Sequence, residues 1–94
     1  MTKYEIVYTS EFRRGVRLLT RRGYDIGKLQ RVILKLANGE TLPKQNNDHA
    51  LKGNWRGYRE CHIASDWLLI YRIDGATLTL VLSRTGTHAD IFNL

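Results

Sequence analysis

Three histidines, one aspartate and one arginine in the second half of the chain have the side chains needed for acid–base chemistry on a phosphate ester. They are His49, His62, Asp66, Arg84 and His88. Imidazole titrates near neutral pH, so it can give or take a proton under physiological conditions. Guanidinium keeps its charge and presents a planar fork of donors to phosphate oxygens.

Cleavage of RNA through its own 2′-hydroxyl is a reaction that needs only these groups. A base removes the 2′ proton, an acid protonates the departing 5′ oxygen, and a cation stabilises the phosphorane. The reaction requires no metal ion, cofactor or external nucleophile, and DNA lacks the hydroxyl on which it depends. The cluster therefore predicts RNA-specific chemistry, provided that the fold brings these residues together.

Each of these residues also has a purely structural interpretation. A histidine at a strand end is more often a satisfied structural residue, Asp66 can form an Asx turn, and Arg84 can be a surface arginine. A zinc site is a further alternative, but the spacing of the histidines matches no compact ligand motif, and we expect no metal. Cys61 has the opposite strand parity from His62 and is expected to face the core, which makes it a weak candidate nucleophile.

The first half of the chain predicts a strand over residues 3–8, followed by two amphipathic helices joined by a short turn. Thr9 or Ser10 can cap the first helix and Asp25 the second, because their side-chain oxygens accept bonds from free backbone N–H groups. Gly23 is a typical stop for the first helix. The two helices are therefore expected to form a hairpin.

Three strands are predicted after a loop over residues 40–52 that lacks hydrophobic periodicity. They cover residues 58–63, 67–73 and 77–83, and an Asp-Gly pair predicts a tight hairpin between the last two.

The last strand places Leu78, Leu80 and Leu82 on one face, which should meet the helices. Arg84 shares their parity, so the strand must end or bulge before it, or the guanidinium would be buried unpaired.

The order strand–helix–helix–strand–strand–strand implies an α+β fold, in which an antiparallel, twisted meander packs against the N-terminal helical hairpin. A single domain is expected over residues 1–94. Because consecutive antiparallel strands place alternate ends together, the 64–66 turn and residue 84 should lie at one edge of the sheet. The loop that carries His49 could reach the same edge.

The net positive charge is concentrated near the N-terminus. The formal net charge is +6, and the first 35 residues contain nine basic side chains against three acidic ones. A concentrated positive field attracts polyphosphates over a Debye length of ~8 Å at physiological salt, so nucleic acid is the first partner to consider. A solvated helix face, an acidic protein partner and an anionic membrane surface are the alternatives.

The apolar runs and the cysteine content favour a cytoplasmic protein. The longest apolar run, residues 67–71, is far too short to span a membrane. The single cysteine cannot form a disulfide within the chain, which fits a reducing compartment.

Three segments together resemble the YafQ-like toxins, which belong to the RelE/ParE superfamily of bacterial toxin–antitoxin systems. They are DHALKGNWRGYRE over residues 48–60, HIASDW over residues 62–67 and RTGTHADIF over residues 84–92. Any one of them alone would be weak, but the combination is specific, and the helical hairpin matches in pattern more than in identity.

The resemblance implies a ribosome-dependent endoribonuclease that cuts mRNA in the ribosomal A site and is held inactive by a cognate antitoxin. Matched position by position, the active site would comprise His49, His62, Asp66, Arg84 and His88. We expect His88 and Asp66 to transfer protons, Arg84 to hold the phosphate, and the other two histidines to assist. Asp66 would need a raised pKa to act as the acid, since an ordinary aspartate has a pKa of about 3.9.

The resemblance also implies residues that contact or support the substrate and its carriers. Trp67 and Phe92 would support or contact the bases of the codon. The basic helices fit docking onto ribosomal RNA through phosphate contacts, which position a protein without reading sequence. Their candidate residues are Arg13, Arg14, Arg17, Arg21, Lys28 and Arg31.

An antitoxin should bury the active edge or displace residues near His88 and Phe92, and the basic helices offer a seat for an acidic segment of it. We therefore expect a monomer when the protein is free and a hetero-oligomer with the antitoxin.

Two other functions are possible on the same fold. One is a non-enzymatic inhibitor of DNA gyrase, as in the ParE branch, which would need no cluster of histidines. The other is a basic RNA-binding module that binds in a salt-dependent manner and does not cleave.

Overall fold

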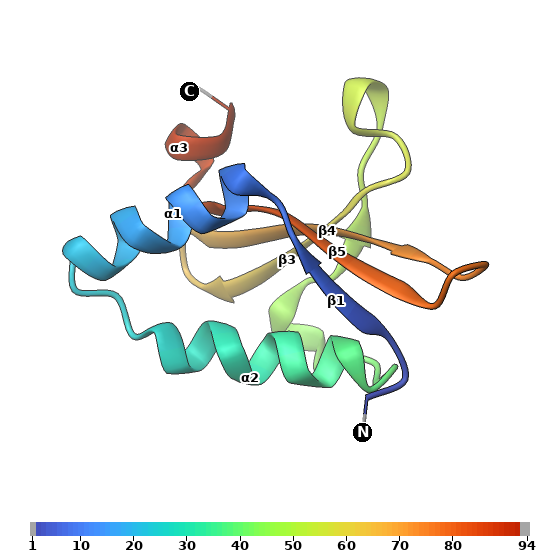
Figure 1. Ribbon diagram of the computed structural model, residues 1–94. Helices are drawn as coiled ribbons and strands as arrows, with labels where there is room; N and C mark the ends of the chain where they lie inside the picture. Colours follow the sequence, from blue (N-terminus) through green and yellow to red (C-terminus); the bar gives the residue numbers. More distant parts are fainter. Residues whose placement is uncertain (1, 93–94) are drawn as a thin grey trace.

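The computed structural model describes residues 2–92 and has one five-stranded sheet with α1 and α2 packed on one side of it (Figure 1). The strands are β1 (Glu5–Tyr8), β2 (His49–Ala50), β3 (Arg59–Ala64), β4 (Trp67–Asp74) and β5 (Thr79–Gly86). The α-helices are α1 (Ser10–Arg21), α2 (Ile26–Ala37) and α3 (His88–Phe92), and two 3-10 helices, η1 (Lys44–Asn46) and η2 (Gly53–Trp55), precede β3. The α+β fold with an N-terminal helical hairpin is thus confirmed.

The sheet has the order β1-β5-β4-β3-β2, so β1 and β2 form its edges. Strands β2 to β5 are antiparallel neighbours, as the meander predicts. β1 departs from this pattern and pairs with β5 in parallel, with Glu5 opposite Thr79 and Tyr8 opposite Leu82. The strand pattern of a sequence does not specify which edge an N-terminal strand joins, and here the path of the helical hairpin across the sheet decides it.

Both helices of the hairpin begin at the residues that the sequence predicts as caps. The hydroxyl of Thr9 accepts a 3.0 Å hydrogen bond from the backbone N–H of Phe12, and the carboxylate of Asp25 accepts one of 3.0 Å from that of Gly27. Gly23 follows the first helix with φ of +84°, a left-handed conformation that glycine adopts without steric cost.

Two segments differ in detail from the sequence prediction. The 40–52 loop contains η1 and the short strand β2, which pairs with β3 and brings residue 49 into the sheet. β5 begins at Thr79, and Leu78 before it has φ of +50° and is 50% exposed, so it does not share the buried face of Leu80 and Leu82. The turn between β4 and β5 therefore extends further along the chain than the leucine pattern predicts.

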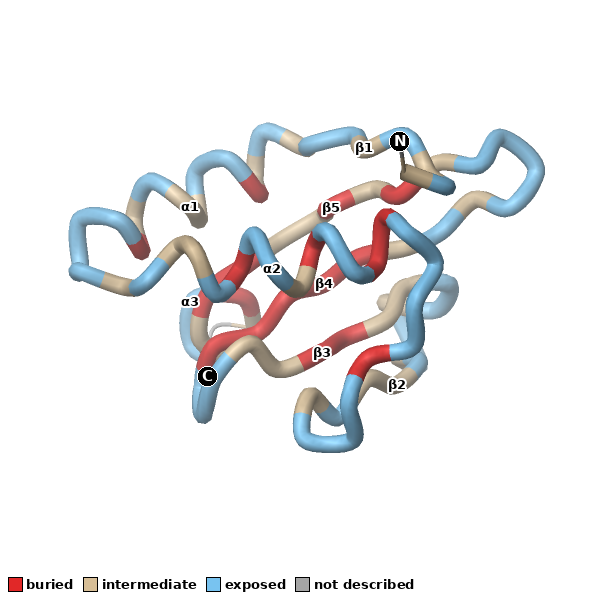
Figure 2. The backbone as a smooth tube through the Cα atoms, turned by 90° about the horizontal axis from the view of Figure 1, so that it is seen from below, coloured by how far each residue is buried: buried red, intermediate tan, exposed pale blue. Residues whose placement is uncertain are grey.

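The central strand β4 is buried on both sides of the sheet over residues 67–71, whereas β5 alternates between buried and partly buried residues (Figure 2). On the helix side, residues of α1 and α2 such as Phe12, Leu19 and Leu29 pack against Leu80 and other strand residues. On the opposite side, a smaller cluster of Leu68, Ile70 and Ile91 is covered only by partly buried residues of loops and of α3. Within residues 2–92, no helix is both long and apolar enough to cross a bilayer.

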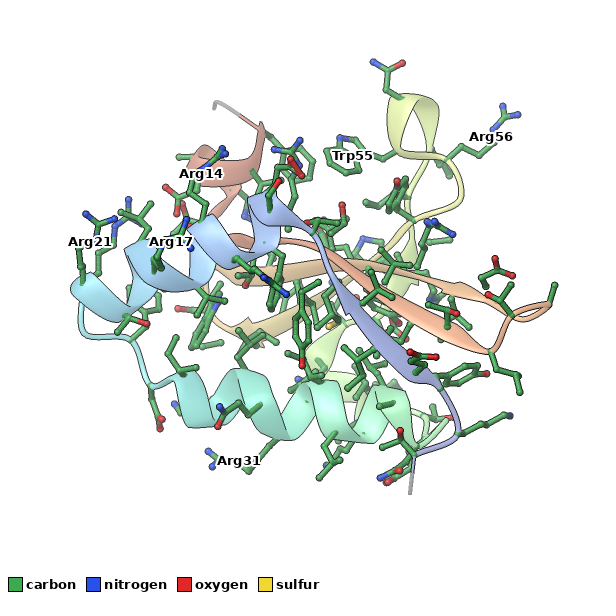
Figure 3. The ribbon with its side chains drawn as sticks, in the orientation of Figure 1. Arg14, Arg17, Arg21, Arg31, Trp55 and Arg56 are labelled. Atoms are coloured by element: carbon green, nitrogen blue, oxygen red, sulfur yellow. The ribbon has the colours of Figure 1, made fainter. Side chains whose placement is uncertain are left out.

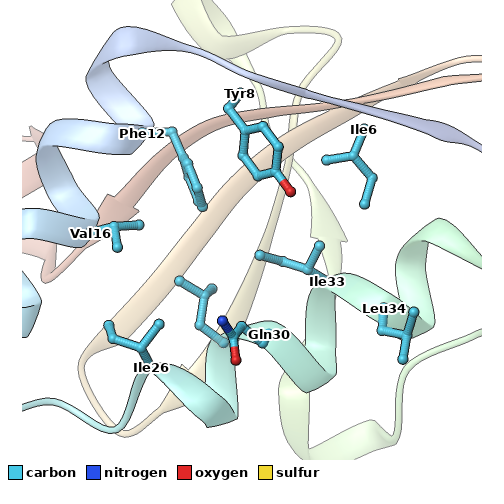
Figure 4. Close-up of a pocket in the computed structure, with 9 residues that line it drawn as sticks. Ile6, Tyr8, Phe12, Val16, Ile26, Gln30, Ile33 and Leu34 are labelled. Carbon is cyan, nitrogen blue, oxygen red and sulfur yellow. The ribbon is translucent and has the colours of Figure 1, made fainter.

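A pocket of about 320 Å³ opens on the helix side, between β1, α1 and α2 (Figure 4). Its lining is mostly apolar and includes Tyr8 and Phe12 on one wall and Ile26 and Ile33 on the other. No candidate catalytic residue lines it.

Candidate active site

A bulge in β5 turns Arg84 out of the core beneath α1 and α2, although it still lines a hollow with Glu11 and Arg14 of α1. Ile70 of β4 pairs with Arg84, whereas the next residue, Tyr71, pairs with Leu82, so Ser83 is an extra residue in the ladder. The extra residue reverses the alternation of side chains. Leu82 therefore stays buried on the helix side, while Arg84 lies against Trp55 on the open side, as the predicted bulge requires.

His88 and Asp66 form the closest pair of the site. Nδ1 of His88 lies 2.6 Å from Oδ1 of Asp66, and the backbone N–H of His88 donates a 3.2 Å hydrogen bond to the same oxygen. Asp66 lies in the turn between β3 and β4, and His88 begins α3 with one residue between it and the end of β5, so the meander brings together two residues far apart in sequence. Because an ionised Asp66 makes Nδ1 the protonated nitrogen of a neutral His88, Nε2 carries the free lone pair.

The contacts with His88 lower the pKa of the Asp66 carboxyl below its ordinary value. The hydrogen bond from the His88 side chain is the largest cause, followed by the bond from its backbone N–H. A carboxylate of this kind is ionised at neutral pH and cannot act as the acid. Asp66 therefore lacks the raised pKa that it would need to act as the acid. The role that is left to it is to orient His88.

The buried carboxylate of Glu60 joins the other two histidines. Oε2 of Glu60 lies 3.2 Å from Nε2 of His49 and 3.8 Å from Nε2 of His62, and Glu60 is only 6% exposed. His49 faces Glu60 across the β2–β3 ladder, and its Nδ1 lies 2.7 Å from the carbonyl oxygen of Asn47. The rings of His62 and His88 are 6.2 Å apart, so the two pairs lie side by side.

Sequence reasoning missed Glu60, although a signal was present. Glu60 and His62 are two positions apart on one strand and therefore share a face. That face is the one opposite to Cys61, which is fully buried on the helix side.

The position of His49 is fixed by its neighbour in the chain. The carboxylate of Asp48 accepts a 2.7 Å hydrogen bond from the hydroxyl of Tyr71 and one of 3.3 Å from Nε of Arg59. These bonds attach β2 to the central strands, although β2 contains only two residues. Burial raises the pKa of the Tyr71 hydroxyl, with the bond to Asp48 as the second cause, so it remains a donor at neutral pH.

Aromatic rings and Arg84 complete the open side. Phe92 lies 6.2 Å from the ring of His88 and 5.9 Å from that of Trp55, and the guanidinium of Arg84 lies 5.5 Å from the centre of the Trp55 ring. The predicted residues His49, His62, Asp66, Arg84, His88 and Phe92 are therefore on the same side of the sheet, at the end where α3 begins.

The geometry of this site can be compared with known proteins. A family model described as the bacterial toxin of type II toxin–antitoxin systems, YafQ, matches residues 4–93 of the chain. The chain belongs to the YafQ toxin family.

Individual relatives match over almost their whole length. The mRNA interferase toxin YafQ of Escherichia coli strain K12 is 38% identical over 93 residues, which is 98% of this chain and 99% of that protein. The crystal structure of YafQ from E. coli strain BL21(DE3) has a TM-score of 0.89 at 37% identity, covering 95% of this chain and 98% of that chain. A chain of the E. coli DinJ-YafQ toxin–antitoxin complex has a TM-score of 0.87 at 37% identity, covering 96% and 98%.

One residue predicted from the YafQ resemblance to contact bases, Trp67, lies in the core. It is 3% exposed, its ring meets that of Tyr24 edge-on at 5.1 Å, and its indole N–H donates a 3.0 Å hydrogen bond to the hydroxyl of Thr85. Of the two parts that the resemblance implies for Trp67, these contacts favour support of the site over contact with a base. Its position next to Asp66 leaves it the supporting role, because it fixes the start of β4.

Cys61, the weak candidate nucleophile, is fully buried as the strand parity predicts. Burial raises the pKa of its thiol to about 12, which keeps it protonated at neutral pH. Among residues 2–92, no three or more His, Cys, Asp and Glu side chains are grouped so that they could hold a metal ion.

The basic residues of this YafQ-family chain do not form one stripe. Arg14, Arg17 and Arg21 extend from α1 on the side of the molecule that carries α3, whereas Arg31 extends from α2 in the opposite direction (Figure 3). Arg13 lies over the ring of Tyr8, with 5.7 Å between the guanidinium and the ring centre. Lys28 lies with Arg31 at a pocket beyond α2. The arginines of α1 are thus nearer to the site than the basic residues of α2.

Proposed function

We propose that this protein is the toxin of a type II toxin–antitoxin system and an endoribonuclease that cleaves mRNA in the ribosomal A site. The family and the E. coli relative named mRNA interferase toxin YafQ support this activity. The observation that carries the proposal is the placement of the His88–Asp66 pair beside His62, with the two rings 6.2 Å apart on an open side of the sheet. A DNA gyrase inhibitor on the same fold would need no such arrangement.

His88 is the general base in the proposed mechanism. Asp66 holds Nδ1 of His88, which orients the ring and leaves Nε2 to remove the proton of the ribose 2′-hydroxyl. The ionised carboxylate then stabilises the imidazolium that forms. Arg84 binds the non-bridging phosphate oxygens, where negative charge develops in the phosphorane.

His62 is the proton donor to the departing 5′ oxygen in the proposed mechanism, because its ring lies 6.2 Å from that of the base, His88. Both ring nitrogens of His49 face protein acceptors, a backbone carbonyl at Nδ1 and the Glu60 carboxylate at Nε2, so His49 assists by position. Glu60, 3.2 Å from His49 and 3.8 Å from His62, holds the two rings in place.

A cognate antitoxin is the proposed partner of this chain. A solved relative is the E. coli DinJ-YafQ toxin–antitoxin complex, which matches the chain over 96% of its length. We infer that the free toxin is a single domain over residues 1–94 that acts in the cytoplasm, where ribosomes are. The exposed arginines of α1 contact ribosomal RNA, and their charge is screened at high salt.

Translation in a reconstituted system tests this function. Wild type should cut a ribosome-bound message at positions mapped by primer extension and leave a 2′,3′-cyclic phosphate. His88→Ala should lower the cleavage rate by ~10²–10⁴-fold, the usual contribution of one proton-transfer group. Glu40→Ala, an exposed substitution on the loop after α2, should cleave at the wild-type rate.

Two results would contradict the proposal. One is a His88→Ala variant that cleaves as fast as wild type. The other is a wild type that leaves ribosome-bound mRNA intact but stops DNA supercoiling by gyrase.

A 2′-deoxy nucleotide at the cleaved position should abolish the cut, because the nucleophile is then missing.

A further inference from the structure

We propose that Trp55 is a positioning residue that holds the guanidinium of Arg84 in place for the scissile phosphate. This inference rests on the proposed ribonuclease function, since it concerns a residue of the same site. The contact that carries it is the placement of the Arg84 guanidinium 5.5 Å from the centre of the Trp55 ring.

The segment that carries Trp55, residues 51–58, is a closed loop with a defined backbone. Its ends are joined by a 3.0 Å hydrogen bond from the N–H of Leu51 to the carbonyl of Tyr58. Inside it, the N–H of Tyr58 bonds to the carbonyl of Trp55 at 3.0 Å. Gly53 and Gly57 have φ of +64° and +93°, in the region that L side chains rarely adopt. The loop thus fixes the backbone of Trp55.

The indole ring is held as firmly as the backbone. The rings of Tyr58 and Phe92 lie 5.4 Å and 5.9 Å away, at 82° and 84° to the Trp55 ring. Figure 3 shows Trp55 pointing from the loop toward α3, whereas Arg56 next to it points away from the molecule. Trp55 also packs against the buried cluster of Leu68, Ile70 and Ile91. A ring with these neighbours is a rigid surface for a flexible side chain.

An aromatic partner suits an arginine that must bind phosphate. A carboxylate would orient the guanidinium but neutralise its charge and occupy its donors. A ring face attracts the cation and leaves the N–H groups at the edge of the guanidinium plane available. Within residues 2–92, Arg84 is in none of the ion pairs closer than 4.0 Å, and the carboxylate of Glu11, whose pKa its charge helps to lower, lines the same hollow without pairing with it.

A double-mutant cycle tests whether Trp55 acts through Arg84. Two quantities are measured on ribosome-bound mRNA. They are the single-turnover cleavage rate at saturating toxin and the toxin concentration that gives half of that rate. Trp55→Ala should lower the rate by about 10-fold with little change in the half-saturating concentration, because a misplaced cation weakens transition-state binding. Trp55→Phe, which keeps a ring face, should restore most of the rate. In an Arg84→Ala background, Trp55→Ala should cost no more than twofold.

A purely structural role for Trp55 gives a different pattern. Leu51→Ala removes another side chain that packs against the same cluster, and should lower the melting temperature while the rate of the folded protein is kept. Trp55→Ala that lowers the rate by the same factor with and without Arg84 would overturn the inference, as would Trp55→Ala with the wild-type rate. Both results leave the proposed function intact, because wild type still cleaves. A wild type that cleaves no message overturns the proposed function instead.

Nuclear magnetic resonance gives a measurement that does not depend on cleavage. The side-chain protons of Arg84 should be shifted upfield by the indole ring current, and the shift should disappear in Trp55→Ala. An unshifted Arg84 in wild type would show that the guanidinium does not rest on the ring, and would overturn the inference.

Discussion

The two sides of the sheet are built in different ways. The helix side is an extensive apolar core in which Leu19, Leu80 and Leu82 are fully buried under α1 and α2. The open side has a small buried cluster, and above it the side chains of His49 and His88 are each 42% exposed. If the open side carries the proposed chemistry and the helix side the stability, substitutions on the two sides should have separable effects.

The largest effect on stability is expected from a cavity on the helix side. Leu80→Ala removes a fully buried side chain and should lower the free energy of unfolding by ~2–5 kcal/mol. Leu78→Ala is the matched control, since Leu78 is on the same segment but 50% exposed, and it should cost less than about 1 kcal/mol. Urea denaturation followed by circular dichroism gives both values. Equal losses for the two variants would contradict the assignment of the core to this side.

Glu60→Gln tests the open side, where a charged residue is buried. The substitution keeps the shape of the side chain but removes the charge that holds Nε2 of His49. We expect the cleavage rate to fall about 10-fold, which corresponds to a hydrogen bond to a charged group of ~1.5 kcal/mol. Glu40→Gln, on the exposed loop after α2, is the control and should leave the rate unchanged. If Glu60→Gln cleaves like wild type, Glu60 does not position the two histidines for the reaction.

The features that could be predicted from the sequence are those determined by neighbours along the chain. Thr9 and Asp25 are helix caps because each bonds to an N–H group two or three residues ahead. The bulge before Arg84 was predictable because a charged side chain on a buried face would otherwise lack a partner.

The features that escaped prediction depend on contacts between distant segments. Glu60 alone resembles a solvated carboxylate, and only the pairing of β2 with β3 places His49 opposite it. The YafQ resemblance implies that Trp67 supports or contacts the bases, and strand alternation could not decide between the two, because β4 is a central strand with buried residues on both sides. Leu78 was expected on the buried face of the last strand, but it has a positive φ and belongs to the turn before β5.

The smallest effect is expected from the ion pair that joins the two sides. Arg22, at the end of α1, donates hydrogen bonds of 2.8 Å and 3.1 Å to the carboxylate of Asp90 in α3, the helix that begins with His88. The bond from Arg22 is the main reason that the pKa of Asp90 is lowered to about 2 from an ordinary 3.8. A lowered pKa means that the stabilisation is complete above the unfolded-state value and is lost as the pH falls from about 4 through 2.

Asp90→Asn measures this contribution. Because the pair is partly exposed, with side-chain exposures of 40% and 20%, we expect a loss of only ~0.5–1 kcal/mol in the free energy of unfolding at pH 7. The difference between wild type and variant should shrink as the pH falls below 4, since wild-type Asp90 then becomes neutral as well. Arg22→Gln should show the same pH dependence, and a difference that stays constant between pH 7 and pH 2 would mean that the carboxylate charge does not hold α3 to α1.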